Sequence, residues 1–137
     1  MKKVFLILLF SIVSFFGLKE LVETHEKNNS ITHWNKAVYI KNKLYSSFNI
    51  DLNITNNDVI GNFCYVTHFG NRIDCDNKFK SQLKNKNIFF DFNSSFGGEN
   101  GKAVISMNSN SISWKLLQEP SGKFYVPKKS ILYINKN

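Results

Sequence analysis

The segment Lys102–Leu117, KAVISMNSNSISWKLL, has two runs of alternating apolar residues on either side of a turn rich in Asn and Ser. If the turn is centred on Ser109 and Asn110, three apolar pairs face each other on one side of a hairpin. These pairs are Ala103 with Leu116, Ile105 with Trp114, and Met107 with Ile112. Polar residues mostly take the other side, so register and burial agree. The segment therefore predicts an antiparallel β-hairpin with one buried face.

Period-two patterns on both sides of this hairpin predict further strands. They are NIDLNIT (49–55), a strand that starts at Val59, IFFDF (88–92), KFYVP (123–127) and SILYI (130–134). The Gly-rich run NSSFGGENG (93–101) predicts a flexible connection. The polar, basic run NKFKSQLKNKN (77–87) predicts either a short helix or a loop.

The segment THWNKAVYIKNKLYSSF, which starts at Thr32, changes the expected fold class. Its apolar residues fall near the spacing of one helical face, which predicts an amphipathic helix over residues 33–47. This face would pack on the core, or else on a partner or a membrane. The predicted class is thus α+β: an N-terminal membrane-anchor or signal helix, one amphipathic helix, and about seven short antiparallel strands forming a sheet or partly closed barrel.

The N-terminal segment MKKVFLILLFSIVSFFGLKE predicts export. Two lysines precede fifteen uncharged residues, 4–18, which is typical of a signal peptide or a membrane anchor. Small residues do not occupy both positions that signal peptidase requires, so an uncleaved inner-membrane anchor is favoured over cleavage and release into the periplasm. Three regions follow: signal peptide or anchor (1–18), stalk (19–31), and a single extracytoplasmic β-rich domain (32–137).

The composition narrows the classes of partner. The 137 residues carry a net charge of +8, which favours acidic partners. Nucleic acid is excluded by the predicted compartment, which leaves an acidic protein face or anionic head groups. The many Asn, Lys, Ile and Phe residues are typical of an AT-rich bacterial coding sequence, so they receive little functional weight.

The chain has two cysteines, Cys64 and Cys75. If Thr67 pairs with Arg72 across a four-residue loop, the two cysteines lie directly opposite each other on neighbouring strands. A disulfide is expected in an oxidising compartment. The alternatives are a metal site formed with His68 and redox catalysis, but the spacing lacks the CxxC pairs typical of both.

No sequence motif indicates an enzyme. The run FGGENGKA departs from the phosphate-binding loop at Phe96 and Ala103, and a strand is expected where that loop needs a helix. Asp74 and Asp76 would both lie on the strand face opposite Cys75, where a pair of solvated carboxylates is expected. The sequence therefore predicts a non-catalytic protein without cofactor or metal.

Two surfaces are candidates for partner binding. One is basic, with Lys78, Lys80, Lys84 and Lys86; the other is the loop around Phe96, Gly97, Gly98 and Glu99. In layout alone, a short N-terminal anchor before a small β domain, the chain resembles ToxS-type accessory proteins, which support a membrane-bound transcriptional regulator. The resemblance implies an accessory protein that binds a regulator or sensor, with a small apolar ligand as a further candidate. The alternative is a soluble periplasmic inhibitor or immunity protein against a secreted toxin or hydrolase.

Overall fold

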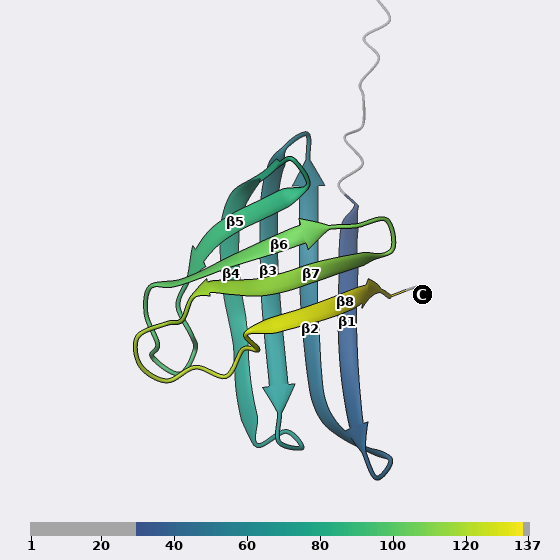
Figure 1. The fold of residues 1–137 in the computed structure, drawn as a ribbon, viewed down its shortest axis with the longest axis vertical. Coiled ribbons are helices and arrows are strands. Elements are labelled where there is room, and N and C mark those ends of the chain that lie inside the picture. Colours follow the sequence, from purple (N-terminus) through teal and green to yellow (C-terminus); the bar gives the residue numbers. More distant parts are fainter. Residues whose placement is uncertain (1–29, 136–137) are drawn as a thin grey trace, which may run out of the picture.

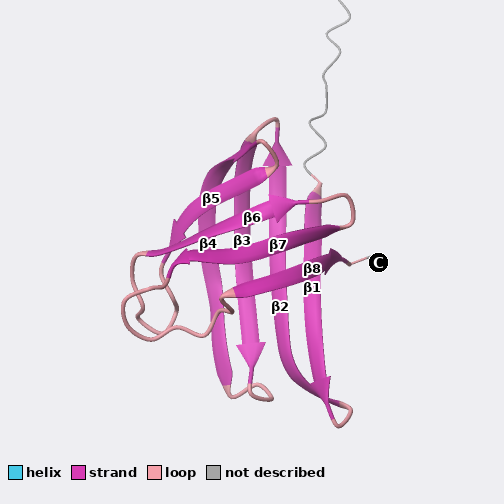
Figure 2. Cartoon of the chain, in the orientation of Figure 1, coloured by secondary structure: helices cyan, strands magenta, loops and turns pink. Residues whose placement is uncertain are grey.

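The computed structural model describes residues 30–135, and all regular elements in this range are β-strands (Figure 2). Eight antiparallel strands follow one another in sequence order and close into a barrel. They are β1 (Ile31–Ile40), β2 (Lys43–Thr55), β3 (Asp58–Thr67), β4 (Arg72–Lys84), β5 (Asn87–Phe92), β6 (Gly101–Met107), β7 (Ser111–Gln118) and β8 (Lys129–Ile134). The predicted anchor (1–18) and most of the predicted stalk (19–31) lie outside the described residues. Within the described range, no helix is long and apolar enough to cross a membrane.

The predicted helix over residues 33–47 is wrong, and the fold class is all-β rather than α+β. This segment forms most of β1, a tight turn, and the start of β2. Lys41 and Asn42 have φ angles of 48° and 62°, as both central residues of a type I′ hairpin turn require. Trp34 and Phe48 reach the core from two paired strands, so their helix-like spacing is a coincidence.

Two other local predictions are also wrong. Residues 77–87 are neither helix nor loop, because β4 continues to Lys84 and a second turn with positive φ follows at Asn85 and Lys86. Residues 123–127 form an irregular segment rather than a strand. The backbone N–H of Tyr125 in this segment donates a hydrogen bond to the buried carboxylate of Asp74.

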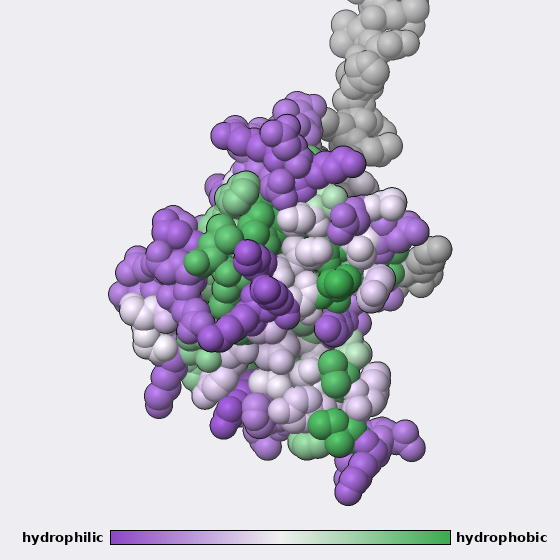
Figure 3. All heavy atoms as spheres, in the orientation of Figure 1, coloured by the Kyte–Doolittle hydropathy of each residue, from purple (hydrophilic) through white to green (hydrophobic). Residues whose placement is uncertain are grey.

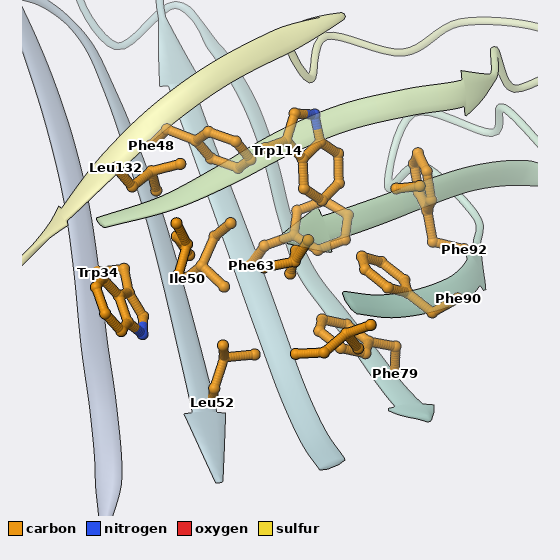
Figure 4. Packing of buried hydrophobic residues seen from close by; sticks show 14 of the residues in the cluster. Trp34, Phe48, Ile50, Leu52, Phe63, Phe79, Phe90, Phe92, Trp114 and Leu132 are labelled. Carbon is orange, nitrogen blue, oxygen red and sulfur yellow. The ribbon is translucent and has the colours of Figure 1, made fainter. Parts of the chain in front are cut away.

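The hairpin predicted for Lys102–Leu117 is confirmed. It is formed by β6 and β7, and its register has all three of the expected apolar pairs. Trp114 is 1% exposed at the centre of the barrel, where its ring contacts those of Phe48 and Phe63 at centroid distances of 5.1 and 5.0 Å. Figure 4 shows these rings packed between strands that come from both halves of the chain.

The barrel consists of two four-stranded layers that cross, β1–β4 behind and β5–β8 in front (Figure 1). Within each layer the strands are paired over most of their length. Only two residue pairs join β4 to β5, and only two join β8 to β1. The barrel therefore has two seams where backbone pairing is interrupted, and side chains determine what fills each of them.

The β4–β5 seam is filled on the inside by stacked aromatic rings. Phe79 of β4 and Phe90 of β5 lie parallel, with centroids 3.8 Å apart. Gly61 of β3 makes room for this stack, because a Cβ at this position would lie 2.3 Å from Cζ of Phe79. The absence of a side chain at residue 61 thus allows the seam to close.

Candidate functional site

The most constrained polar group in the barrel is the carboxylate of Asp74, near the start of β4. It is fully buried, and no ion pair connects it to a cation within residues 30–135. Five hydrogen bonds satisfy it instead. The donors are the Ser94 hydroxyl (2.8 Å), the Ser95 N–H (2.9 Å), the Ser95 hydroxyl (3.1 Å), the Tyr125 N–H (3.1 Å) and the Asn77 side-chain amide (3.2 Å). The expectation of a solvated carboxylate at residue 74 is therefore wrong.

These hydrogen bonds also determine the charge state of Asp74. Burial raises the pKa of the carboxyl group, since it disfavours the charged form. The donated hydrogen bonds, led by that from the Tyr125 N–H, outweigh this effect and hold the pKa below its ordinary value. Asp74 is consequently an anion at neutral pH, and it connects three distant parts of the chain.

The Gly-rich connection is fixed by hydrogen bonds along its length. In residues 93–100, named here the pinned loop, the Ser94 N–H donates to the Gly98 carbonyl at 2.7 Å, and the Gly98 N–H donates to the Lys123 carbonyl at 3.0 Å. Glu99 pairs with Ser121 through two backbone hydrogen bonds. The flexible connection expected here is instead an ordered loop attached to the segment that follows β7.

An aromatic and cationic cluster lies on the outer side of this network. The Phe96 ring packs edge-on against that of Tyr125 at 4.4 Å, and the guanidinium of Arg72 lies 5.2 Å from the Tyr125 centroid. Phe96 is 41% exposed. We name Arg72, Phe96 and Tyr125 the loop platform. Its side chains are exposed or half-buried, and the backbone that carries them is held from beneath by Asp74.

The two predicted partner-binding surfaces meet only at Lys78. This lysine and both ends of the pinned loop line a surface hollow of about 320 Å³. The lining residues are Lys78, Asp91, Phe92, Asn93, Asn100 and Lys102. Lys80 is exposed further along β4, and Lys84 and Lys86 lie at the β4–β5 turn. That turn is at the upper end of the molecule, where Figure 3 shows hydrophilic atoms gathered. Most of the predicted basic run is therefore distant from the loop.

The four predicted loop residues have different environments. Phe96 and Glu99 are exposed, whereas Gly98 is buried. A Cβ at Gly98 would lie 2.7 Å from the Lys123 carbonyl oxygen, so this glycine allows the two segments to approach each other. Gly97 has φ +90°, a conformation that other residues rarely adopt. The glycines shape the loop, and Phe96 is the side chain that it presents.

The disulfide between Cys64 and Cys75 is confirmed. Thr67 pairs with Arg72 as predicted, and a register shift between Phe63 and Tyr65 follows at the cysteines. The disulfide connects β3 to β4 next to Asp74, and the Cys75 N–H donates to the Ser95 hydroxyl at 3.3 Å. It therefore fixes the strand from which the Asp74 network extends.

The metal-site alternative is wrong, because both cysteine sulfurs are used in the disulfide. His68 lies in the β3–β4 turn with φ 53°, and its ring packs against Tyr45 at 5.4 Å. Its Nδ1 atom is buried without a hydrogen-bond partner in the described part of the chain. No group of three or more metal-ligating side chains occurs within residues 30–135.

Arg72 and Tyr125 were not identified from the sequence as site residues. They are 53 positions apart, and no local pattern indicates that the irregular segment 123–127 returns to the start of β4. Neither Cys75 nor the Gly-rich loop that follows it in the sequence indicates that Arg72 and Tyr125 lie in contact. The buried Asp74 carboxylate, which accepts a hydrogen bond from the Tyr125 N–H, helps to hold the two segments together.

Fold and site define a class: a small, disulfide-bonded, eight-stranded antiparallel barrel with an ordered loop platform beside one seam. Comparisons with models of known protein families, with curated protein sequences and with solved structures found no match. Function is therefore inferred from the geometry of this chain.

Proposed function

We propose that this chain is a non-catalytic accessory protein, anchored in the bacterial inner membrane by residues 4–18, that binds the periplasmic part of a membrane-bound regulator or sensor. The loop platform is the observation that supports this proposal. The few residues that dominate the binding energy at protein interfaces are enriched in Trp, Tyr and Arg, and the loop platform contains Arg72 and Tyr125. A surface that is already ordered loses less conformational entropy on binding. The net charge of +8 favours a partner with an acidic face.

Site-specific photo-crosslinking in the native cell tests this proposal. A photoreactive amino acid replaces Phe96 in the full-length chain, and the matched control replaces Phe89. Phe89 is 55% exposed on β5 but is not part of the loop platform. An adduct with one membrane protein from position 96 and none from position 89 supports the proposal. Equal labelling at the two positions, or no adduct at 96, contradicts it.

The cross-linked partner then allows a quantitative test. We expect Phe96→Ala and Arg72→Ala each to weaken binding of the purified partner about 10- to 30-fold, as for residues at the centre of an interface. Phe89→Ala should change the affinity less than twofold. Similar losses for all three variants would show that the platform is not the binding surface.

A soluble inhibitor or immunity protein is the second candidate. It is favoured by one observation: the pinned loop presents an exposed Phe96 from a hydrogen-bonded backbone, which is how a preorganised loop blocks an enzyme or toxin. N-terminal sequencing of the exported protein separates the two proposals. A mature chain that starts near residue 18 favours the inhibitor, and an intact N-terminus favours the anchored accessory protein.

A further inference from the structure

The second seam, between β8 and β1, differs from the first, whose inner side is filled by the Phe79–Phe90 stack and whose surface hollow has Asp91 in its lining. Beyond its two residue pairs, a hollow of about 460 Å³ lies along the seam, and a second hollow of about 90 Å³ adjoins it. Lys36, Lys129 and Ser130 line both of them. We name the two hollows together the seam groove.

Three exposed lysines are the charged residues that line the seam groove. Lys36, Lys115 and Lys129 line the larger hollow, and neither hollow has an Asp or Glu in its lining. None of the three forms an ion pair with another described residue. Lys115 and Lys129 are directly opposite each other on β7 and β8. Like charges in this position destabilise a sheet, so this arrangement costs stability unless an anion is bound.

Two serines provide a second, independent indication. Ser46 and Ser130 line the smaller hollow and are 6% and 9% exposed. Neither hydroxyl forms a hydrogen bond to another described residue, and neither oxygen is sealed from solvent, since the one buried and unpaired side-chain atom within residues 30–135 is Nδ1 of His68. Both hydroxyls are therefore open to the hollow. Within the barrel, these hydroxyls contrast with the Ser94 hydroxyl, which donates to Asp74.

We propose that the seam groove binds a phosphate group. A phosphate carries up to two negative charges and three acceptor oxygens, so it can accept hydrogen bonds from ammonium and hydroxyl groups together. Lys36 and Lys129 would contact it from the two strands of the seam, with Lys115 beside them and the hydroxyl of Ser130 as a neutral donor. Binding also removes the repulsion between Lys115 and Lys129.

Part of the groove lining is apolar. Ile131, which is 48% exposed, lines the larger hollow beside the lysines, so an organic group attached to the phosphate has a surface to contact. Two sources fit this chemistry: a soluble phosphomonoester and the phosphate of an anionic lipid. The site is distinct from the loop platform and does not depend on the function proposed above.

Calorimetry with the full-length chain in a non-ionic detergent tests this inference. The probes are glycerol 3-phosphate and monomeric dihexanoyl phosphatidic acid, each compared with sodium chloride at equal ionic strength. We expect saturable binding of at least one phosphate probe with a stoichiometry of one. Tighter binding of glycerol 3-phosphate identifies a soluble ligand, and tighter binding of the short-chain lipid identifies a lipid phosphate. Failure of both probes to bind above the chloride control would overturn the proposal.

Matched variants show whether the groove is the binding site. Lys36→Gln with Lys129→Gln should weaken binding of the better probe at least 10-fold. Lys41→Gln with Lys43→Gln removes the same charge from the β1–β2 hairpin and should change binding less than twofold. Before binding is measured, both double variants must be shown to unfold cooperatively, which confirms that they are folded. Equal losses in the two variants would show that net charge, not the seam groove, attracts phosphate, and would also overturn the proposal.

Discussion

The two seams of this barrel are alike in backbone pairing and opposite in chemistry. Each is joined by only two residue pairs. The β4–β5 seam is filled by the stacked rings of Phe79 and Phe90, and each buried donor and acceptor of the Asp74 network beside it is paired. The β8–β1 seam has three lysines without acidic partners and two serine hydroxyls that are open to the smaller hollow. The polar groups beside the first seam satisfy one another, whereas those of the second seam are left open to a ligand.

Removal of the Asp74 carboxylate should have the largest effect on the first seam. We expect Asp74→Ala to lower the free energy of unfolding by about 3 to 5 kcal/mol, because it leaves several buried donors without an acceptor. The measurement is urea denaturation followed by tryptophan fluorescence. Asp58→Ala, at an exposed residue next to the β2–β3 turn, should change stability by less than about 0.5 kcal/mol. If the two substitutions cost the same, Asp74 does not hold the loops.

The stability of the barrel should depend almost as strongly on the space that Gly61 leaves for the stacked rings of Phe79 and Phe90. Gly61→Ala places a methyl group in the position of the Phe79 ring and should cost about 2 kcal/mol, in the range for overpacked cores. Combining it with Phe79→Leu, which removes ring atoms at the clash, should cost less than the sum of the two single changes. Additive losses would show that Gly61 does not act through Phe79.

Acid should weaken the Asp74 network in a defined pH range. The folded-state pKa of Asp74 lies below its ordinary value, so the stability that the carboxylate contributes is complete above the unfolded-state pKa, near 4. It decreases as the pH falls through the folded-state pKa. The melting temperature of the wild type should thus fall below about pH 4, and the part of this fall that is due to Asp74 should be absent in Asp74→Asn. Parallel pH profiles would assign the acid sensitivity to other groups.

Local sequence patterns correctly predicted the structural features that involve residues close together in the chain. The β6–β7 register and the Cys64–Cys75 disulfide follow from alternation and turn position, and both are confirmed. The pattern failed at residues 33–47, because helical spacing and strand alternation overlap there and the turn at Lys41 and Asn42 was missed. The turn signal was present, since Asn readily adopts positive φ.

The chemistry at the two seams depends on contacts between distant segments, which a single sequence does not encode locally. Asp74 accepts from an N–H that is 51 residues away, and Lys36 meets Lys129 only because the barrel closes. A solvated strand face was the reasonable expectation for Asp74 when only its neighbours were known. Barrel closure reversed that expectation and brought the lysines of the second seam together.

The smallest predicted effect gives the sharpest contrast between the seams. Lys115→Gln removes one of two facing like charges and should raise the free energy of unfolding by about 0.2 to 1 kcal/mol without ligand. Lys41→Gln, the matched loss of charge on the β1–β2 hairpin, should not. At low ionic strength the difference should increase, because screening of the repulsion is weaker. A substitution that stabilises the β8–β1 seam, while each change at the β4–β5 seam destabilises it, is expected if only the β8–β1 seam keeps its charges for a ligand. Destabilisation by Lys115→Gln would mean that these lysines support the fold, and the contrast between the two seams would be lost.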